Sequence, residues 1–232
     1  LVFYLFYQVR WRGTDASGHT GPPPDYPKHP KSKQMCKTNR CGRSATLSFE
    51  QVELFCSNLP EKFSLLAEVM YGSAGRVGEI SQIKVRNLNI KGGLLTIEKS
   101  TTKTKETRQV PLGETTISKL QSWIKQNSLQ GKDYIFFTQS RNTKYKEGEK
   151  AISTQSVDEA FRKTFAFIGF EGCSTHTFRR SALTHLLEEG WNMREIMLIS
   201  GHKNLASLQK YLDADRNETF KKYRELQQRK VL

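Results

Sequence analysis

Apolar residues recur at helical spacing over most of the chain. Between residues 47 and 59, Val52 and Phe55 mark one helical face, as expected for a helix that packs on a core. Ser48 and Gln51 precede this face at the spacing of a capping box, in which each residue pairs with the backbone N–H of the other at the first turn of a helix. The pattern therefore predicts a helix that begins just after Ser48.

The same periodicity predicts a series of further helices. They cover residues 60–72, the first part of 75–90, 116–127, 156–169, 175–190, 192–201, 204–215 and 217–230. Ser156 with Glu159, and Asn192 with Glu195, have capping-box spacing, so we expect both pairs to start their helices. Gly201 is expected to end the helix that Asn192 starts, because glycine closes many helices.

One stretch has a different pattern. In residues 94–112, "LLTIEKSTTKTKETRQVPL", two strand-like runs flank a turn rich in threonine and lysine, which predicts a β-hairpin. The expected fold class is α+β and mostly α, a helical bundle with a small antiparallel β-sheet.

The first part of the chain lacks such periodicity. Residues 13–45 are dominated by Gly, Pro, Ser, Lys and Thr, a composition typical of a linker or a disordered arm. Residues 1–7, "LVFYLFY", are apolar but lack the flanking signals of a signal peptide, so we interpret them as the remnant of a buried element. We predict an unstructured or remnant basic N-terminal arm over 1–46 and one globular domain over 47–232.

The charge favours a polyanionic partner. The 232 residues include 37 Lys and Arg against 23 Asp and Glu, a formal net charge of +14. Binding of a basic surface to nucleic acid lowers the free energy, because the bound phosphates release condensed counterions. General solubility is the alternative reading of the charge. The basic part of the arm, residues 28–43, either lies along DNA or is a solvated tether.

The cysteines and the hydropathy indicate the cellular compartment of the protein. The four cysteines, Cys36, Cys41, Cys56 and Cys173, do not look like a disulfide framework. No second Cys/His pair accompanies Cys36 and Cys41 at the spacing of zinc ligands. No apolar run reaches the roughly 18 residues of a membrane span. We therefore expect a reduced, cytoplasmic protein that does not act at a membrane.

Several side chains suit chemistry at a phosphodiester. A tyrosine oxygen can attack the phosphorus and form a covalent intermediate, and arginines can bind the negative charge of the transition state. A lysine can protonate the departing sugar oxygen, and histidines can orient the phosphate or accept a proton. The candidates are Arg76, Lys103, His176, Arg179, His202 and Tyr211.

The first two boxes come before the middle of the chain. "GSAGRVGE" contains Arg76 and the acidic residue Glu79, and Lys103 stands in the predicted hairpin, eight residues before Pro111. These features resemble the first-arginine box and the hairpin lysine of the tyrosine recombinase (phage integrase) family. Lys99 and Lys105 are rivals of Lys103 for the hairpin position.

The remaining boxes follow in the order of the family. "HTFR" contains His176 and Arg179 at positions i and i+3 of a predicted helix, and Gly201 with His202 is followed nine residues later by Tyr211. Each box alone is weak, but together they resemble the family's catalytic domain from residue 47 to about residue 225.

The resemblance implies a nucleophile and a phosphate clamp. Tyr211 is implied as the nucleophile of a 3′-phosphotyrosyl link, and Arg76 and Arg179 as the clamp on the scissile phosphate. Lys103 is implied as the proton donor to the leaving 5′ oxygen. Neither a metal nor a nucleotide cofactor is implied, because the energy of the broken bond is kept in the phosphotyrosine.

Supporting roles are implied for further residues. His176 is implied as a proton acceptor or a phosphate contact, His202 as a hydrogen-bond donor to the phosphate, and Glu79 as a support for Arg76 or His176. The basic residues expected to contact the DNA backbone are Lys105, Arg180 and Lys203. For Arg180 and Lys203, ordinary solvation is the alternative.

The implied function is site-specific DNA recombination or integration on double-stranded DNA, with self-association as a tetramer on the DNA. Two alternatives stay open at this point: a DNA-relaxing activity like that of type IB topoisomerases, and a non-catalytic DNA-binding accessory protein. Most members of the family carry an N-terminal DNA-clamping domain of roughly a hundred residues, whereas 46 residues precede Leu47 here. We therefore expect strand cleavage by this chain, and inefficient recombination by the chain alone.

Overall fold

The computed structural model describes residues 43–102, 106–138, 146–209 and 211, together with 220, 223–225 and 227–228. The predicted N-terminal arm lies outside the described residues except for its last few positions, as do Lys103 and Lys105.

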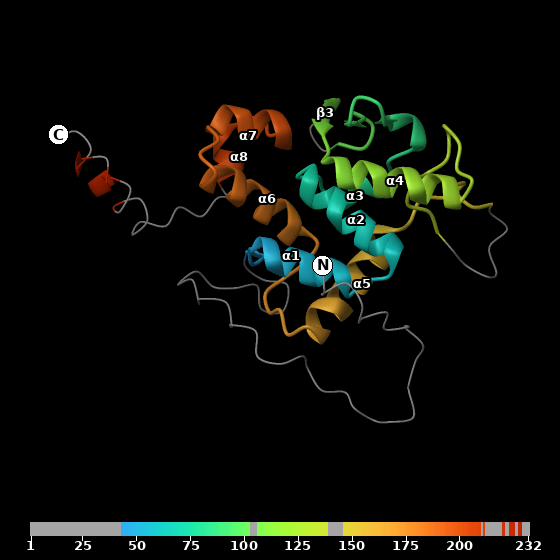
Figure 1. Cartoon of the computed structure of the whole chain (residues 1–232), viewed down its shortest axis with the longest axis horizontal. Helices are drawn as coiled ribbons and strands as arrows, with labels where there is room; N and C mark the ends of the chain where they lie inside the picture. The colour runs from blue at the N-terminus through green and yellow to red at the C-terminus, as the bar shows by residue number, and fades with distance from the viewer. Residues whose placement is uncertain are drawn as a thin grey trace, which may run out of the picture.

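Helices form most of the described structure (Figure 1). They are α1 (Phe49–Ser57), α2 (Glu61–Gly72), α3 (Val77–Ile80), α4 (Glu114–Gln126), α5 (Thr154–Phe167), α6 (His176–Glu188), α7 (Met193–Ser200), α8 (Leu205–Gln209) and the 3₁₀ turn η1 (Val85–Asn87). The fold class predicted from the sequence, a mostly helical domain with one small sheet, is confirmed.

The sheet has three antiparallel strands in the order β1–β2–β3. They are β1 (Leu88–Asn89), β2 (Leu94–Ile97) and β3 (Arg108–Pro111). The pairs Leu95↔Val110 and Ile97↔Arg108 fix the register of the predicted hairpin. Because side chains alternate between the two faces of a strand, Arg108 lies on the same face as the buried Val110.

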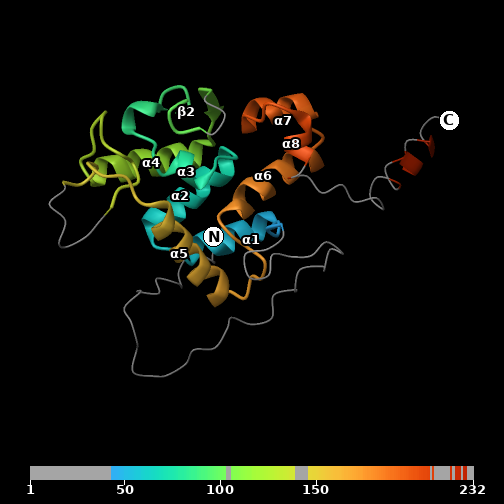
Figure 2. The same cartoon turned by 180° about the vertical axis from the view of Figure 1, so that it is seen from behind.

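Helix α6 runs through the middle of the molecule and connects its parts. One end lies near α1 and the other meets α7 and α8, while α2 packs along its side (Figures 1 and 2). Helix α7 also packs against β3 of the sheet. Three segments that are distant in the sequence therefore meet where α6 passes between α2, α7 and the sheet.

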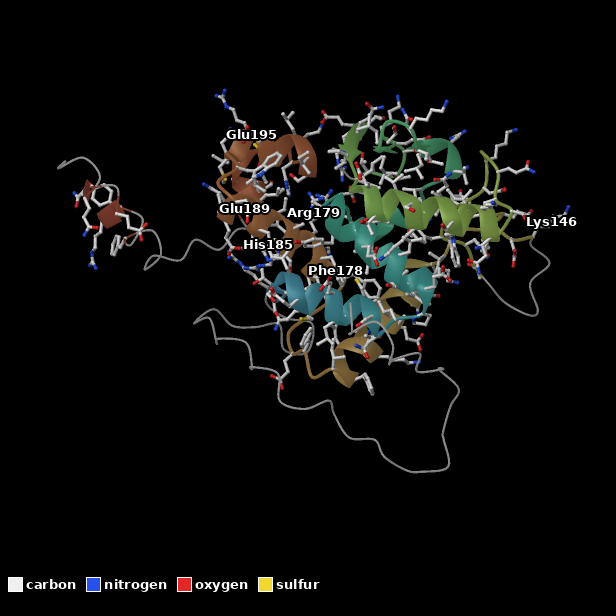
Figure 3. The ribbon with its side chains drawn as sticks, viewed as in Figure 1. Lys146, Phe178, Arg179, His185, Glu189 and Glu195 are labelled. Atoms are coloured by element: carbon white, nitrogen blue, oxygen red, sulfur yellow. The ribbon has the colours of Figure 1, made fainter. Side chains whose placement is uncertain are left out.

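Aromatic rings fill the core below α6. Phe55 of α1 lies 4.2 Å from Phe165 and 5.1 Å from Phe178 between ring centroids, and Phe161 lies 5.2 Å from both Phe55 and Phe178. Phe178 is marked in Figure 3 on α6, one residue before Arg179. Because α6 is anchored by this ring, the position of the next residue is fixed as well.

Two predicted helix starts are confirmed and one is wrong. Ser48 and Asn192 each form a complete capping box. Helix α5, however, begins at Thr154 with Ser153 as its cap, because the Ser153 hydroxyl accepts a hydrogen bond from the Ser156 backbone N–H at 3.0 Å. Two serines spaced by three residues can each cap a helix, and the earlier one gains one more helical turn.

No helix in the described part of the chain is both long and apolar enough to cross a membrane.

The aromatic core yields a stability test. We expect Phe55→Ala to lower the free energy of unfolding by about 3–5 kcal/mol, because Phe55 is fully buried and its loss leaves a cavity. Phe167→Ala is the matched control: Phe167 is 60% exposed, so a change within about 0.5 kcal/mol is expected. Urea unfolding of the two variants measures both values, and equal losses would contradict this description of the core.

Candidate active site

The Arg179 side chain joins three segments of the chain. It is fully buried, and Figure 3 places it where α6 faces the end of α2. Its Nη1 donates to the Ala74 carbonyl at 2.6 Å, and its Nη2 donates to the Ser200 carbonyl at 2.8 Å. A buried charge is tolerated only with such partners. Burial, and then the nearby charge of Arg76, lowers the pKa of Arg179 to about 9, so the group remains protonated at neutral pH.

His202 sits between Arg179 and Ser200. The Ser200 hydroxyl lies 2.7 Å from Nδ1, and Arg179 Nη2 lies 3.1 Å from Nε2. Arg179 Nη2 also lies 3.4 Å from Nδ1, so the guanidinium faces both ring nitrogens. Burial, and next the charge of Arg179, lowers the pKa of His202 to about 3. The ring is thus neutral, and both of its nitrogens are engaged.

Tyr211 lies against this pair. Its ring centroid is 5.1 Å from that of His202, and the Arg179 guanidinium carbon is 5.5 Å from the Tyr211 ring centroid. Arginine over an aromatic face is a favourable cation–π arrangement. The fold therefore brings Tyr211, His202 and Arg179 together, three of the residues that the sequence singled out.

Glu79 connects two further arginines. Its Oε1 accepts from Arg76 Nη1 at 2.8 Å, and its Oε2 accepts from Arg108 Nη2 at 2.7 Å and from the Arg76 backbone N–H at 3.1 Å. Burial pushes the pKa of Glu79 up, but the hydrogen bonds and charges of Arg108 and Arg76 outweigh it, and the pKa lies below its usual range. Glu79 is thus a buried carboxylate that holds Arg76, one of its two expected partners, and also Arg108.

Arg108 is a site residue that the sequence analysis missed. It is one of many basic residues in the predicted hairpin, and nothing in composition distinguishes it. The available signal was the alternation of the strand: Arg108 shares the core-facing side with Val110, and a charge at such a position requires a buried partner.

Of the other predicted catalytic and DNA-binding residues, His176 lies on the surface, and two lysines lie outside the described residues. His176 is exposed at the first position of α6, and its backbone N–H donates to the Ser174 hydroxyl at 3.3 Å. Lys103 and Lys105 lie outside the described residues. The roles of all three stay predictions.

The two remaining predicted DNA contacts differ in exposure. Arg180 is 5% exposed, so a phosphate outside the protein could reach its guanidinium only after neighbouring groups moved. Arg179 is just as buried, so burial does not decide between the two arginines, and the role of Arg180 stays a prediction. Lys203 has a half-exposed side chain and forms an ion pair with Glu106 at 2.9 Å. Both of these side chains are accessible, so the pair can exchange for a phosphate at little cost.

The site carries an excess of positive charge. Arg76, Arg108 and Arg179 surround one carboxylate, Glu79, and act together on the pKa of His202. Within the described part of the chain, Arg108 Nε and Nη1 and Arg179 Nε have no hydrogen-bond partner although they are buried. Buried donors are nearly always paired in folded proteins. The excess positive charge of the site suits an anion with several oxygens, such as a phosphodiester.

Comparison with known proteins identifies the family. The model of the phage integrase family matches residues 46–218, and the chain belongs to that family. The tyrosine recombinase XerC of Proteus mirabilis is 28% identical over 160 residues, covering 68% of this chain and 49% of the relative. This chain thus spans about half the length of that relative.

Solved structures share the fold. The crystal structure of a XerA recombinase superposes with a TM-score of 0.66 at 18% identity, covering 80% of this chain and 66% of the other. An integrase of the transposon Tn1549, in complex with a circular intermediate DNA, gives a TM-score of 0.65 at 16% identity with the same coverage.

The buried imidazole makes stability depend on pH. The folded pKa of His202, about 3, lies below its ordinary value of 6.5, so between these values the unfolded chain binds a proton that the folded chain does not. The stability contributed by neutral His202 is therefore present above pH 6.5 and is lost as the pH falls toward 3.

Urea unfolding at pH 7 and pH 5 tests this dependence. Wild type is expected to lose more stability between the two pH values than His202→Gln, because glutamine can keep the bonds to Ser200 and Arg179 without titrating. All other titrating groups are common to both proteins. Equal losses would show that His202 is not held neutral.

Proposed function

We propose that this protein is a site-specific recombinase that breaks and rejoins double-stranded DNA through a 3′-phosphotyrosyl intermediate. The observation that carries the proposal is the packing of the Tyr211 ring on Arg179 and His202, inside a cluster with excess positive charge. Membership of the phage integrase family supports it, as does the DNA bound by the Tn1549 integrase of similar fold.

The proposed reaction exchanges one phosphoester bond for another. The Tyr211 oxygen attacks the phosphorus, the bond from phosphorus to the 5′ oxygen breaks, and the phosphate becomes linked to tyrosine. The phenol proton leaves to His176 or to solvent, and Lys103 donates a proton to the 5′ oxygen. A 5′ hydroxyl of the partner strand then attacks the phosphotyrosine and reverses the exchange. Bond energy is retained, so neither a metal nor a nucleotide cofactor is part of the proposal.

The arginines have distinct places in this proposal. Arg76 has a side chain that is 20% exposed and can meet a phosphate as it stands. Arg179 is enclosed by its backbone partners and the Tyr211 ring. Contact between Arg179 and the scissile phosphate therefore requires the ring to move off the guanidinium, and Arg179 Nε, which has no partner among the described residues, becomes available to a phosphate oxygen.

The same movement concerns His202. Both of its nitrogens lie within hydrogen-bond distance of Arg179 or Ser200 in the described arrangement. If Arg179 turns toward the phosphate, Nε2 is released, and the tautomer with its proton on Nε2 can donate to a phosphate oxygen. Ser200 can support either tautomer, because a hydroxyl both donates and accepts.

We also propose that the protein self-associates on DNA, as a tetramer. Residues 220, 223–225 and 227–228 lie away from the body of the domain in both views (Figures 1 and 2). Tyr223 is 59% exposed there. An exposed aromatic ring on such a segment suits a neighbouring protomer.

The proposal also includes the place of action and the domain boundary. We propose that the protein acts in the cytoplasm on cellular DNA, and that its catalytic domain begins near residue 47. The family match over residues 46–218 supports that boundary.

A nicked suicide substrate tests the chemistry. Its short 5′ end diffuses away after cleavage, which traps the covalent product on a denaturing gel. Wild type is expected to form the adduct and Tyr211→Phe none, since phenylalanine keeps the ring but lacks the attacking oxygen. Tyr223→Phe is the control, since it removes an exposed phenol and should leave the adduct unchanged. Loss of the adduct in Tyr223→Phe instead would move the nucleophile to that residue.

The clamp is tested in the same assay. Arg179→Ala is expected to slow adduct formation by about 10²-fold or more, the loss typical of a removed transition-state donor. Lys103→Ala is also expected to be slow, through loss of the proton donor. If wild type binds DNA but never forms an adduct, the protein is a binding accessory. If it relaxes supercoiled plasmid without site preference, the activity is of the topoisomerase type.

A further inference from the structure

The β2–β3 hairpin is attached to the candidate active site where its strands enter the connecting loop. We call this place, which Thr102 and Glu106 close, the hairpin base: the Glu106 backbone N–H donates to the Thr102 hydroxyl at 3.1 Å. Lys103 lies in the chain between these two residues. The position of the base relative to the phosphate-binding residues therefore sets where the chain that carries Lys103 begins and ends.

Arg108 provides a buried attachment on the β3 side. Its side chain is 9% exposed, and its Nη2 lies 2.7 Å from Glu79 Oε2. Glu79 in turn holds Arg76 at 2.8 Å. The hairpin strand is thus linked through one carboxylate to an arginine of the proposed phosphate clamp.

Arg108 also contacts the corner that precedes His202. Gly201 has a left-handed φ of +69°, and a Cβ placed on it would lie 3.0 Å from Arg108 Cδ and 3.1 Å from Nη1. The Arg108 side chain therefore lies directly on the Gly201 backbone. One arginine connects three parts of the site: the hairpin, the loop that carries Arg76, and the corner before His202.

A second attachment exists but is weaker. Lys203 and Glu106 form an ion pair at 2.9 Å, with side chains that are 52% and 63% exposed. Exposed pairs contribute from nothing to about 1 kcal/mol, whereas removing one partner of a buried pair leaves an uncompensated charge. Between these two links, Arg108 therefore decides the position of the hairpin base.

Direct contact between Arg108 and the DNA phosphate does not fit the geometry. The two Arg108 nitrogens that have no hydrogen-bond partner among the described residues, Nε and Nη1, are buried and lie beside Gly201. A phosphate could reach them only if the corner at Gly201 moved away. Arg108 is therefore placed to act on the chemistry through the hairpin it holds.

We propose that Arg108 is a positioning residue that holds the hairpin on Glu79 and Gly201, and so delivers the proton donor of the hairpin to the leaving 5′ oxygen. This inference rests on the proposed function. Misplacement of a reacting group by about 1 Å can cost 10²-fold in rate, and general acid catalysis contributes about 10²–10⁴-fold. Loss of Arg108 should thus affect protonation of the leaving group and not the clamp on the phosphate.

The test compares two suicide substrates. One carries the ordinary 5′ oxygen at the scissile position and the other a bridging 5′ sulfur. When the bond from phosphorus to sulfur breaks, the sulfur leaves as a thiolate, which is a weak base and needs no proton. We expect Arg108→Met to form the adduct about 10²-fold more slowly than wild type on the oxygen substrate. On the sulfur substrate it should approach the wild-type rate.

Control variants separate the possible causes. Lys103→Ala should show the same rescue by sulfur, and Arg179→Ala should show none, because its defect lies in the clamp. Arg86→Met is the matched control: Arg86 pairs with Glu98 beside the same sheet but has a half-exposed side chain. It should behave as wild type on both substrates. Arg108→Lys, which keeps a charge for Glu79, should lose less rate than Arg108→Met.

The outcomes separate the positioning role of Arg108 from the proposed function. An Arg108→Met protein that cleaves the oxygen substrate as wild type does, or that is folded and equally slow on both substrates, overturns the positioning role. If Arg108→Met does not fold, the ratio of oxygen to sulfur rates in Arg108→Lys decides: a ratio lower than that of wild type supports the role, and an unchanged ratio overturns it. Absence of an adduct from wild type on both substrates would instead refute the proposed function.

Discussion

The buried guanidinium of Arg179 is the interaction on which the site depends. It donates to the carbonyls of Ala74 and Ser200, which lie in parts of the chain that meet only in the folded protein. A buried charge without such partners costs several kcal/mol, so α6, the loop after α2 and the end of α7 must come together for the domain to be stable. Formation of the fold and assembly of the site are for this reason one process.

Glu79 balances the charges around that centre. Three arginines lie in the site, and Glu79 forms ion pairs with two of them, Arg76 and Arg108. The site therefore keeps a net positive charge. The same field, together with burial, keeps His202 neutral. In the proposed function this positive charge is already in place before DNA binds, whereas Arg179 and the Tyr211 ring still have to separate.

The sequence was informative where a local rule operates. Amphipathic periodicity located the helices, and the capping boxes at Ser48 and Asn192 located two starts to the residue. It failed at α5, where Ser153 and Ser156 can each cap a helix and the structure uses Ser153, which adds a helical turn. The sequence analysis also missed Arg108. Strand alternation places Arg108 on the same face as Val110, but this identifies a buried arginine only once Val110 is known to be buried.

By itself, the sequence determined which kinds of chemistry are present and in which order: arginines, histidines and a tyrosine at the spacing of one family. The tertiary structure alone decided that Arg179 is enclosed, that His202 is neutral, that Arg180 is buried and that Arg108 belongs to the site. The physical reason is that burial and charge act through space. The Ala74 carbonyl that receives Arg179 lies 105 positions earlier in the chain, and no local pattern records that contact.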